Sequence, residues 1–297
     1  MRADAGRPDG PAHTGVESRA AVDAVVLAGG PADPTLTRDA LPKAFAVIGE
    51  STMVERVLAA LRGVPQIRRV AVVGPDPMPP AVAAVATLAV PAAGGILDNL
   101  AAGLCALEHN SPPGAASPGD VAAVLVAAAD VPLLTAEAVA AFLREAQRAS
   151  VDAAYAIVPR EDVARAAPGV RKTFVRVADG EFTGGSLVLL RPGAFARARP
   201  VIERAVLARK RPWELARLLG IGTLLGLATG RLRIAALERR AETVAGLRAR
   251  AIVCRDAGVA LDVDTPEMLA FVRRRLAVAG TGGPRARAVG GSGQGTS

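Results

Sequence analysis

A short apolar run that stops at two adjacent glycines restricts the fold of this chain more than any other feature. Residues 24–27 are Ala-Val-Val-Leu, and Gly29 and Gly30 follow directly after Ala28. An apolar run without polar alternation is typical of a parallel strand buried on both faces. Glycines after such a strand let backbone N–H groups approach a polyphosphate that a Cβ would obstruct. The run therefore predicts the first strand of an α/β sheet, with an anion site at its end.

Runs of strand length alternate with amphipathic stretches of helix length from about residue 22 onward. The capping box Thr52-x-x-Glu55 opens one of these helices. Strands that alternate with helices at this spacing predict a Rossmann-like α/β fold with a doubly wound, mostly parallel sheet. A β-hairpin is expected around the turn at 178–180. The expected strands are 24–27, 69–74, 87–93, 121–129, 153–158, 186–190, 231–237 and 259–263.

The chain divides into one expected domain and two tails. Residues 1–20 and 279–297 are rich in Gly and Arg and are expected to be disordered. Residues 21–278 are expected to form a single domain, in which 151–250 leave the regular rhythm and add a hairpin and helices. The N-terminus lacks the apolar core of a signal peptide, and the most apolar later stretch, 215–227, is too short to span a bilayer. A cytoplasmic protein is therefore expected, with no membrane partner.

Composition excludes some functions. Aromatic residues make up only 3% of the chain, too few for the stacking platforms of a single-strand nucleic-acid binder. The net charge of +8 is interpreted first as an arginine-rich solvated surface, and an anionic partner is the alternative. Cys105 and Cys254 lack C-x-x-C spacing and are expected to be buried and reduced. His13 and His109 have no evident partner, so histidine-based catalysis is not expected.

A lysine follows the glycine loop, in the segment Pro42-Lys43-Ala-Phe. A lysine at this place adds a point charge to an anion held by the glycines. Neither G-x-G-x-x-G nor G-x-x-x-x-G-K-[ST] occurs there. The segment from Leu27 to Gly30, taken with Lys43, therefore predicts a nucleoside triphosphate site. The alternative is a structural turn beside a solvated lysine.

Carboxylates stand at the ends of two expected strands. Asp130 ends the strand at 121–129, and Asp262 and Asp264 end the strand at 259–263. Ligands of open α/β sheets gather at the carboxyl ends of the strands, and residues spaced by two point to one face of a strand. Mg²⁺ often binds through one or two carboxylates and substrate phosphates. The pattern predicts a metal-bridged triphosphate, and the alternative is a set of helix-capping or arginine-paired acids.

Together, Leu-Ala-Gly-Gly, Pro-Lys-Ala, Asp-Val-Pro and Asp-Val-Asp-Thr-Pro resemble the MobA-like NTP transferase family over roughly residues 22–275. This family includes molybdenum-cofactor and phospholactate guanylyltransferases and sugar-phosphate nucleotidylyltransferases. The resemblance implies an enzyme of the EC 2.7.7 type that uses Mg²⁺ and an NTP, with GTP or CTP favoured, and a small phosphorylated acceptor. It implies catalytic roles for Lys43, Asp130 and Asp264, nucleotide binding by Leu27, Ala28, Gly29, Gly30 and Lys43, and metal binding by Asp130 and Asp264, with Asp262 as a third candidate.

Two further segments have roles implied by the resemblance. Asp98 and Asn99 would contact base and ribose, although capping of the helix at 96–108 explains both residues equally well. The region 151–250 would carry the acceptor, where basic residues suit a phosphate. A charged hairpin edge is the alternative there. The candidate acceptor residues are Arg171, Lys172, Gly184 and Gly185.

The glycine loop departs from the family pattern, which has an arginine and another glycine soon after Gly-Gly. Here residues 31–39 follow Gly29-Gly30, and Arg38 is the candidate for the arginine of the family pattern. A nucleotide-binding protein without catalysis therefore stays open as an alternative. A dinucleotide-dependent oxidoreductase is a second alternative, but the chain lacks the glycine motif G-x-G-x-x-G of that class. The acceptor, the base and a homodimeric state are left open.

Overall fold

The structure is a computed structural model that describes residues 20–37, 40–110, 123–208 and 220–281. Arg38 and most of both expected tails lie outside these residues. The last helix, α10 (Pro266–Thr281), continues past the expected domain end at residue 278. Within the described residues, no helix has the length and apolar character needed to cross a membrane.

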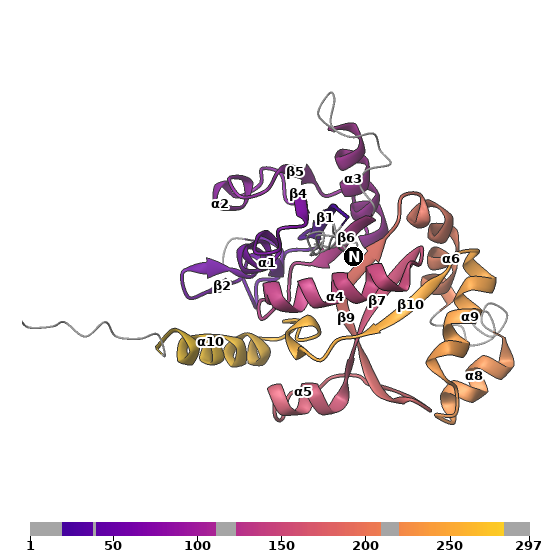
Figure 1. Cartoon of the computed structure of the whole chain (residues 1–297). Helices are drawn as coiled ribbons and strands as arrows, with labels where there is room; N and C mark the ends of the chain where they lie inside the picture. The colour runs from indigo at the N-terminus through magenta and orange to yellow at the C-terminus, as the bar shows by residue number, and fades with distance from the viewer. Residues whose placement is uncertain (1–19, 38–39, 111–122, 209–219, 282–297) are drawn as a thin grey trace, which may run out of the picture.

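An eight-stranded sheet forms the centre of the molecule, in the order β10-β7-β9-β6-β1-β4-β5, with β8 paired to β9 (Figure 1). All neighbours pair in parallel except β9, which is antiparallel to β6, β7 and β8. The amino end of β9 therefore lies at the carboxyl edge of the parallel strands. The strands are β1 (Val22–Leu27), β4 (Ile67–Gly74), β5 (Leu88–Pro91), β6 (Ala123–Ala128), β7 (Ala153–Pro159), β8 (Val175–Val177), β9 (Gly180–Leu190) and β10 (Ala249–Val253), and β2 (Val47–Ile48) and β3 (Ser51–Thr52) form a separate hairpin.

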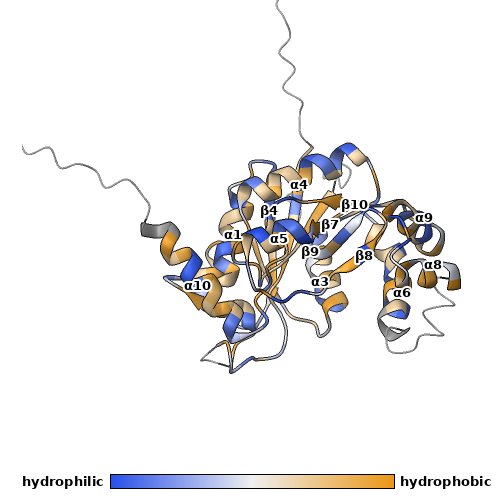
Figure 2. Cartoon of the chain, turned by 90° about the horizontal axis from the view of Figure 1, so that it is seen from below, coloured by the Kyte–Doolittle hydropathy of each residue, from blue (hydrophilic) through white to orange (hydrophobic). Residues whose placement is uncertain are grey.

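Helices cover both faces of the sheet, and Figure 2 shows the hydrophobic strands enclosed between them. Successive residues of β1 point to opposite faces. Val26 packs in the cluster that includes α1 and α4, whereas Val25 packs with Leu100 of α3 and Phe195 of α6. The helices are α1 (Met53–Arg62), α2 (Pro80–Ala83), α3 (Ile96–His109), α4 (Ala136–Ala149), α5 (Arg160–Ala166), α6 (Ala194–Ala208), α8 (Ile221–Ala228), α9 (Ile234–Ala245) and α10, with short 3-10 turns η1 (Lys43–Phe45) and η2 (Ala257–Val259).

Sequence motifs predicted local structure correctly where the interacting residues are close in sequence. The capping box at Thr52 forms with both reciprocal hydrogen bonds to Glu55, and α1 begins there. The hairpin is confirmed as β8 and β9, and the expected strand at 186–190 is the second half of β9. These features depend on neighbours in sequence, so the sequence alone predicts them.

Two expected strands are wrong. The segment 231–237 instead leads into α9, which begins at Ile234. The segment 259–263 leaves η2 and runs on without pairing in the sheet, although Val259, Leu261 and Val263 are buried. Its apolar character reflects this burial rather than a strand. β10 was not among the expected strands. It follows α9, which ends where Gly246 adopts a left-handed conformation with φ +63°. Cys105 is exposed, contrary to expectation, and Cys254 is buried.

Candidate active site

The glycine loop leaves β1 at the carboxyl edge of the sheet. The Ala28 N–H donates to the carbonyl of Val73 in β4, at 2.8 Å, which continues the strand pairing past Leu27. A Cβ on Gly29 would lie 2.8 Å from Nδ2 of Asn99, so the loop approaches α3 more closely than any other residue type allows. Gly30 has φ +148°, a conformation that favours glycine. The two glycines therefore have different roles: Gly29 allows close packing, and Gly30 allows a bend of the backbone.

Asp98 and Asn99 both hold the loop before α3. The Asn99 side chain is buried, and its Oδ1 accepts from the Ala93 N–H at 2.7 Å. The Asp98 carboxylate accepts from the Gly95 N–H at 3.3 Å and pairs with Arg199 at 2.7 Å. The capping interactions are therefore present, and base recognition by either residue stays a prediction.

Lys43, Asp130 and Asp264 meet at the carboxyl edge, although they come from distant parts of the chain. The Lys43 Nζ lies 2.6 Å from Oδ2 of Asp130 and also contacts Oδ1 of Asp264. Lys43 starts η1, Asp130 follows β6, and Asp264 precedes α10. The Val263 N–H donates to the carbonyl of Asp130 at 2.9 Å, which joins the two acid-bearing segments through the backbone. One ammonium thus links two carboxylates beside the glycine loop.

The charged groups of this cluster shift one another's pKa values. Burial lowers the pKa of Lys43, but the two carboxylates outweigh it and the net shift is upward. The pKa of Asp264 is lowered by its hydrogen bond with Asp262 and by Lys43. Burial raises the pKa of Asp262, its hydrogen bond with Asp264 adds to the rise, and Lys172 opposes it. The ammonium of Lys43 and the carboxylate of Asp264 therefore stabilise each other's charged forms.

The donor set fits a magnesium ion held by two carboxylates. Oδ1 of Asp130 is buried and has no hydrogen-bond partner among the described residues, which leaves a hard oxygen acceptor unused. No cluster of three or more acidic, histidine or cysteine ligands occurs in the described part of the chain. Mg²⁺ that bridges substrate phosphates needs only one or two carboxylates. Asp130 and Asp264 meet this requirement, whereas Asp262 forms its ion pair with Lys172.

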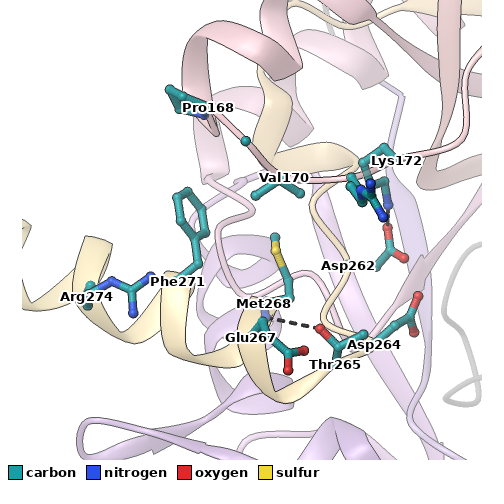
Figure 3. A pocket seen from close by; sticks show the side chains of 12 residues that line it. Pro168, Val170, Lys172, Asp262, Asp264, Thr265, Glu267, Met268, Phe271 and Arg274 are labelled. Carbon is teal, nitrogen blue, oxygen red and sulfur yellow. Dashed lines mark hydrogen bonds and ion pairs between the residues drawn. The ribbon is translucent and has the colours of Figure 1, made fainter.

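A cleft of about 530 Å³ adjoins the cluster, between residues 168–172 and the start of α10 (Figure 3). Of the four predicted acceptor residues, Arg171 and Lys172 line it. The structure places the two glycines against protein atoms instead. A Cβ on Gly184 would lie 2.1 Å from the Tyr155 hydroxyl, and one on Gly185 would lie 2.9 Å from Cβ of Ala156. These glycines accommodate side chains beside the cleft.

Sequence reasoning missed three residues of this region. Tyr155, the only tyrosine of the chain, places its hydroxyl beside Gly184, and burial together with Asp262 raises its pKa. Phe271 and Arg274 line the cleft from α10. Their spacing of three residues, which puts side chains on one helix face, was the available signal.

Gly258 supports the segment that carries Asp130, and we expect Gly258→Ala to destabilise the protein. A Cβ there would lie 2.3 Å from the carbonyl oxygen of Leu133, so the backbone of η2 or of the loop after β6 must shift. Overpacking of this kind costs about 1–3 kcal/mol. Chemical denaturation measures the loss. Gly222→Ala in α8 is the matched control, because nothing lies within 4 Å of its Cβ position. Equal stability of both variants would contradict the expected clash.

Comparison with known proteins gives consistent results. The MobA-like NTP transferase domain matches residues 24–277. A hypothetical transferase from Thermus thermophilus is 38% identical, with a TM-score of 0.72 over 84% of this chain and 99% of that one. The 4-diphosphocytidyl-2C-methyl-D-erythritol synthase of Anaerococcus prevotii (9% identical, TM-score 0.53, 86% and 96% covered) shares the fold. A CMP:2-keto-3-deoxy-manno-octonic acid synthetase complexed with CTP also shares the fold. It is 15% identical, with a TM-score of 0.51 over 87% of this chain and 99% of that one. No curated protein sequence matches the chain.

Proposed function

The chain belongs to the MobA-like NTP transferase family of nucleotidyltransferases, and from this premise we propose what it transfers and how. We propose that it moves a nucleoside monophosphate from an NTP, GTP or CTP first, to a phosphorylated small molecule and releases pyrophosphate. The observation that carries this proposal is the Lys43 ammonium shared by Asp130 and Asp264 beside the glycine loop. The family membership favours this activity over a dinucleotide-dependent oxidoreductase.

The strand order supports a division of the site into a donor side and an acceptor side. The glycine loop follows β1, which lies between β6 and β4, and Asp130 follows β6. Beyond β6 lie β9 and β7, and both contact η2, which leads into the segment that carries Asp262 and Asp264 at the cleft. An NTP on the glycine loop and an acceptor in the cleft would meet above β6. Asp130 stands at that meeting point.

In the proposed reaction, a phosphate oxygen of the acceptor attacks the α-phosphorus of the NTP. A new P–O bond forms, the bond between the α-phosphorus and the bridging oxygen breaks, and pyrophosphate departs. The acceptor oxygen is already anionic, so no general base is needed. Backbone N–H groups of Ala28, Gly29 and Gly30 and the ammonium of Lys43 would orient the triphosphate and neutralise its charge. Mg²⁺ bound by Asp130 and Asp264 would supply further charge neutralisation on the phosphates.

Release of pyrophosphate in the presence of a mixed acceptor supply tests the proposal. The protein is incubated with Mg²⁺, one NTP and a protein-free extract of cellular small molecules, and pyrophosphate is measured. We expect release with GTP or CTP that depends on both the extract and the metal. Metal-dependent NTP binding without release in any extract fraction would instead identify a nucleotide-binding protein that lacks catalysis.

A further inference from the structure

The cleft beside Asp262 and Asp264 has the size of a small-molecule site. Its volume of about 530 Å³ falls in the range that suits ligands of this class. In Figure 3, residues 168–172 form one wall and α10 forms the other, and the two aspartates stand at one end. A molecule in this cleft would therefore reach the carboxylate cluster at that end. This placement is what an acceptor requires under the proposed function, on which the inference rests.

Both walls of the cleft contribute apolar side chains. Val170 faces Met268 and Phe271 across the opening, and all three side chains are partly or fully withdrawn from solvent (Figure 3). These side chains cannot hydrogen-bond to hydroxyl groups. A polyhydroxylated acceptor placed against them would lose hydration without compensation, which is unfavourable. An apolar carbon group would gain contact with the same surface.

Some charged residues of the cleft are paired within the protein, and others have no ion pair among the described residues. Lys172 is paired with Asp262, and the Glu267 carboxylate is held at the start of α10 by its own backbone and by Thr265. Arg171 and Arg274 have no ion pair among the described residues, and both line the cleft. Guanidinium groups bind phosphate and carboxylate groups strongly. The cations that remain available therefore lie next to the apolar side chains, Arg171 beside Val170 and Arg274 beside Phe271.

We propose that the acceptor is a phosphorylated molecule with a compact apolar carbon group rather than a sugar or other polyol. Phe271 contacts the apolar group and determines specificity, and Arg274, three residues further along α10, attracts the anionic acceptor into the cleft. The acceptor phosphate points toward Asp264, where the donor is attacked. Under this assignment the cleft selects the acceptor, whereas the NTP is selected on the other side of β6, at the glycine loop.

Two commercial phosphate monoesters probe this class directly, phenyl phosphate and glycerol 2-phosphate. Their affinities are measured by calorimetry on the full chain with Mg²⁺. We expect phenyl phosphate to bind at least about tenfold more tightly, as burial of an aromatic ring predicts. Phe271→Ser should remove this preference, and Phe271→Leu should retain most of it. Arg274→Gln should weaken both probes by a similar factor.

The outcomes distinguish this inference from the proposed function. NTP binding, measured on the same samples, should be unchanged in the Phe271 and Arg274 variants, which also shows that they are folded. Equal or tighter binding of glycerol 2-phosphate by the unsubstituted protein would overturn the apolar-acceptor assignment. An unchanged preference in Phe271→Ser would overturn it as well. Absence of NTP binding, by contrast, would refute the nucleotidyltransferase proposal itself.

Discussion

Asp130→Ala is expected to lower pyrophosphate release by roughly 100- to 1,000-fold, the range typical of losing one electrostatic contact to the reacting groups. The same change should leave the protein folded, with little change in stability. Oδ1 of Asp130 is buried without a partner among the described residues, and the cost of its desolvation offsets the ion pair of Oδ2 with Lys43 in the absence of ligands. A side chain kept at such a cost is typical of a functional site.

Steady-state assays and thermal unfolding measure the two effects on the same preparation. Glu50→Ala is the control, because Glu50 is an exposed carboxylate outside the candidate site. We expect the control to match the unsubstituted protein in both measurements. Full turnover by Asp130→Ala would remove Asp130 from the catalytic machinery.

Lys43→Met is expected to abolish turnover and to increase the affinity of the NTP-free protein for Mg²⁺. The ammonium now neutralises Asp130 and Asp264, and it occupies the space between them. Methionine keeps a chain of similar length but leaves two carboxylates that repel each other, so a divalent cation gains a site without competition. The triphosphate at the same time loses its lysine contact.

Calorimetric titration with Mg²⁺ in the absence of nucleotide measures the first effect, and pyrophosphate release measures the second. In EDTA the variant should also unfold at a lower temperature, and Mg²⁺ should restore part of the difference. Unchanged Mg²⁺ affinity would show that Lys43 does not compete with the metal, even if turnover is lost.

The elements predicted correctly from the sequence are those whose signals are local. The apolar runs of β1 and β6, and the capping box of α1, reflect interactions with near neighbours or burial on both faces. The segment 259–263 has the same apolar pattern but pairs with no strand. Its backbone instead donates a hydrogen bond from the Val263 N–H to the carbonyl of Asp130. Burial and strand pairing give the same pattern in a sequence, so that pattern cannot separate them.

The candidate site shows the same limit. The sequence placed Asp130 and Asp264 at the ends of expected strands, and the structure brings both to Lys43. The spacing of two predicted that Asp262 would face the same site. No strand forms there, and Asp262 forms its ion pair with Lys172 rather than with Lys43. The pairing of carboxylates with particular lysines depends on tertiary packing, which no motif encodes.

Nucleotide titration of the purified protein tests the central claim most directly. GTP, CTP, ATP and UTP are titrated separately, each with Mg²⁺ and with EDTA, into the unsubstituted protein and into Asp130→Ala. We predict that GTP or CTP binds the unsubstituted protein in Mg²⁺ and much more weakly in EDTA, and that Asp130→Ala loses this difference. Failure of every NTP to bind, or equal binding in Mg²⁺ and EDTA, would contradict a metal-dependent nucleotide site at Lys43, Asp130 and Asp264.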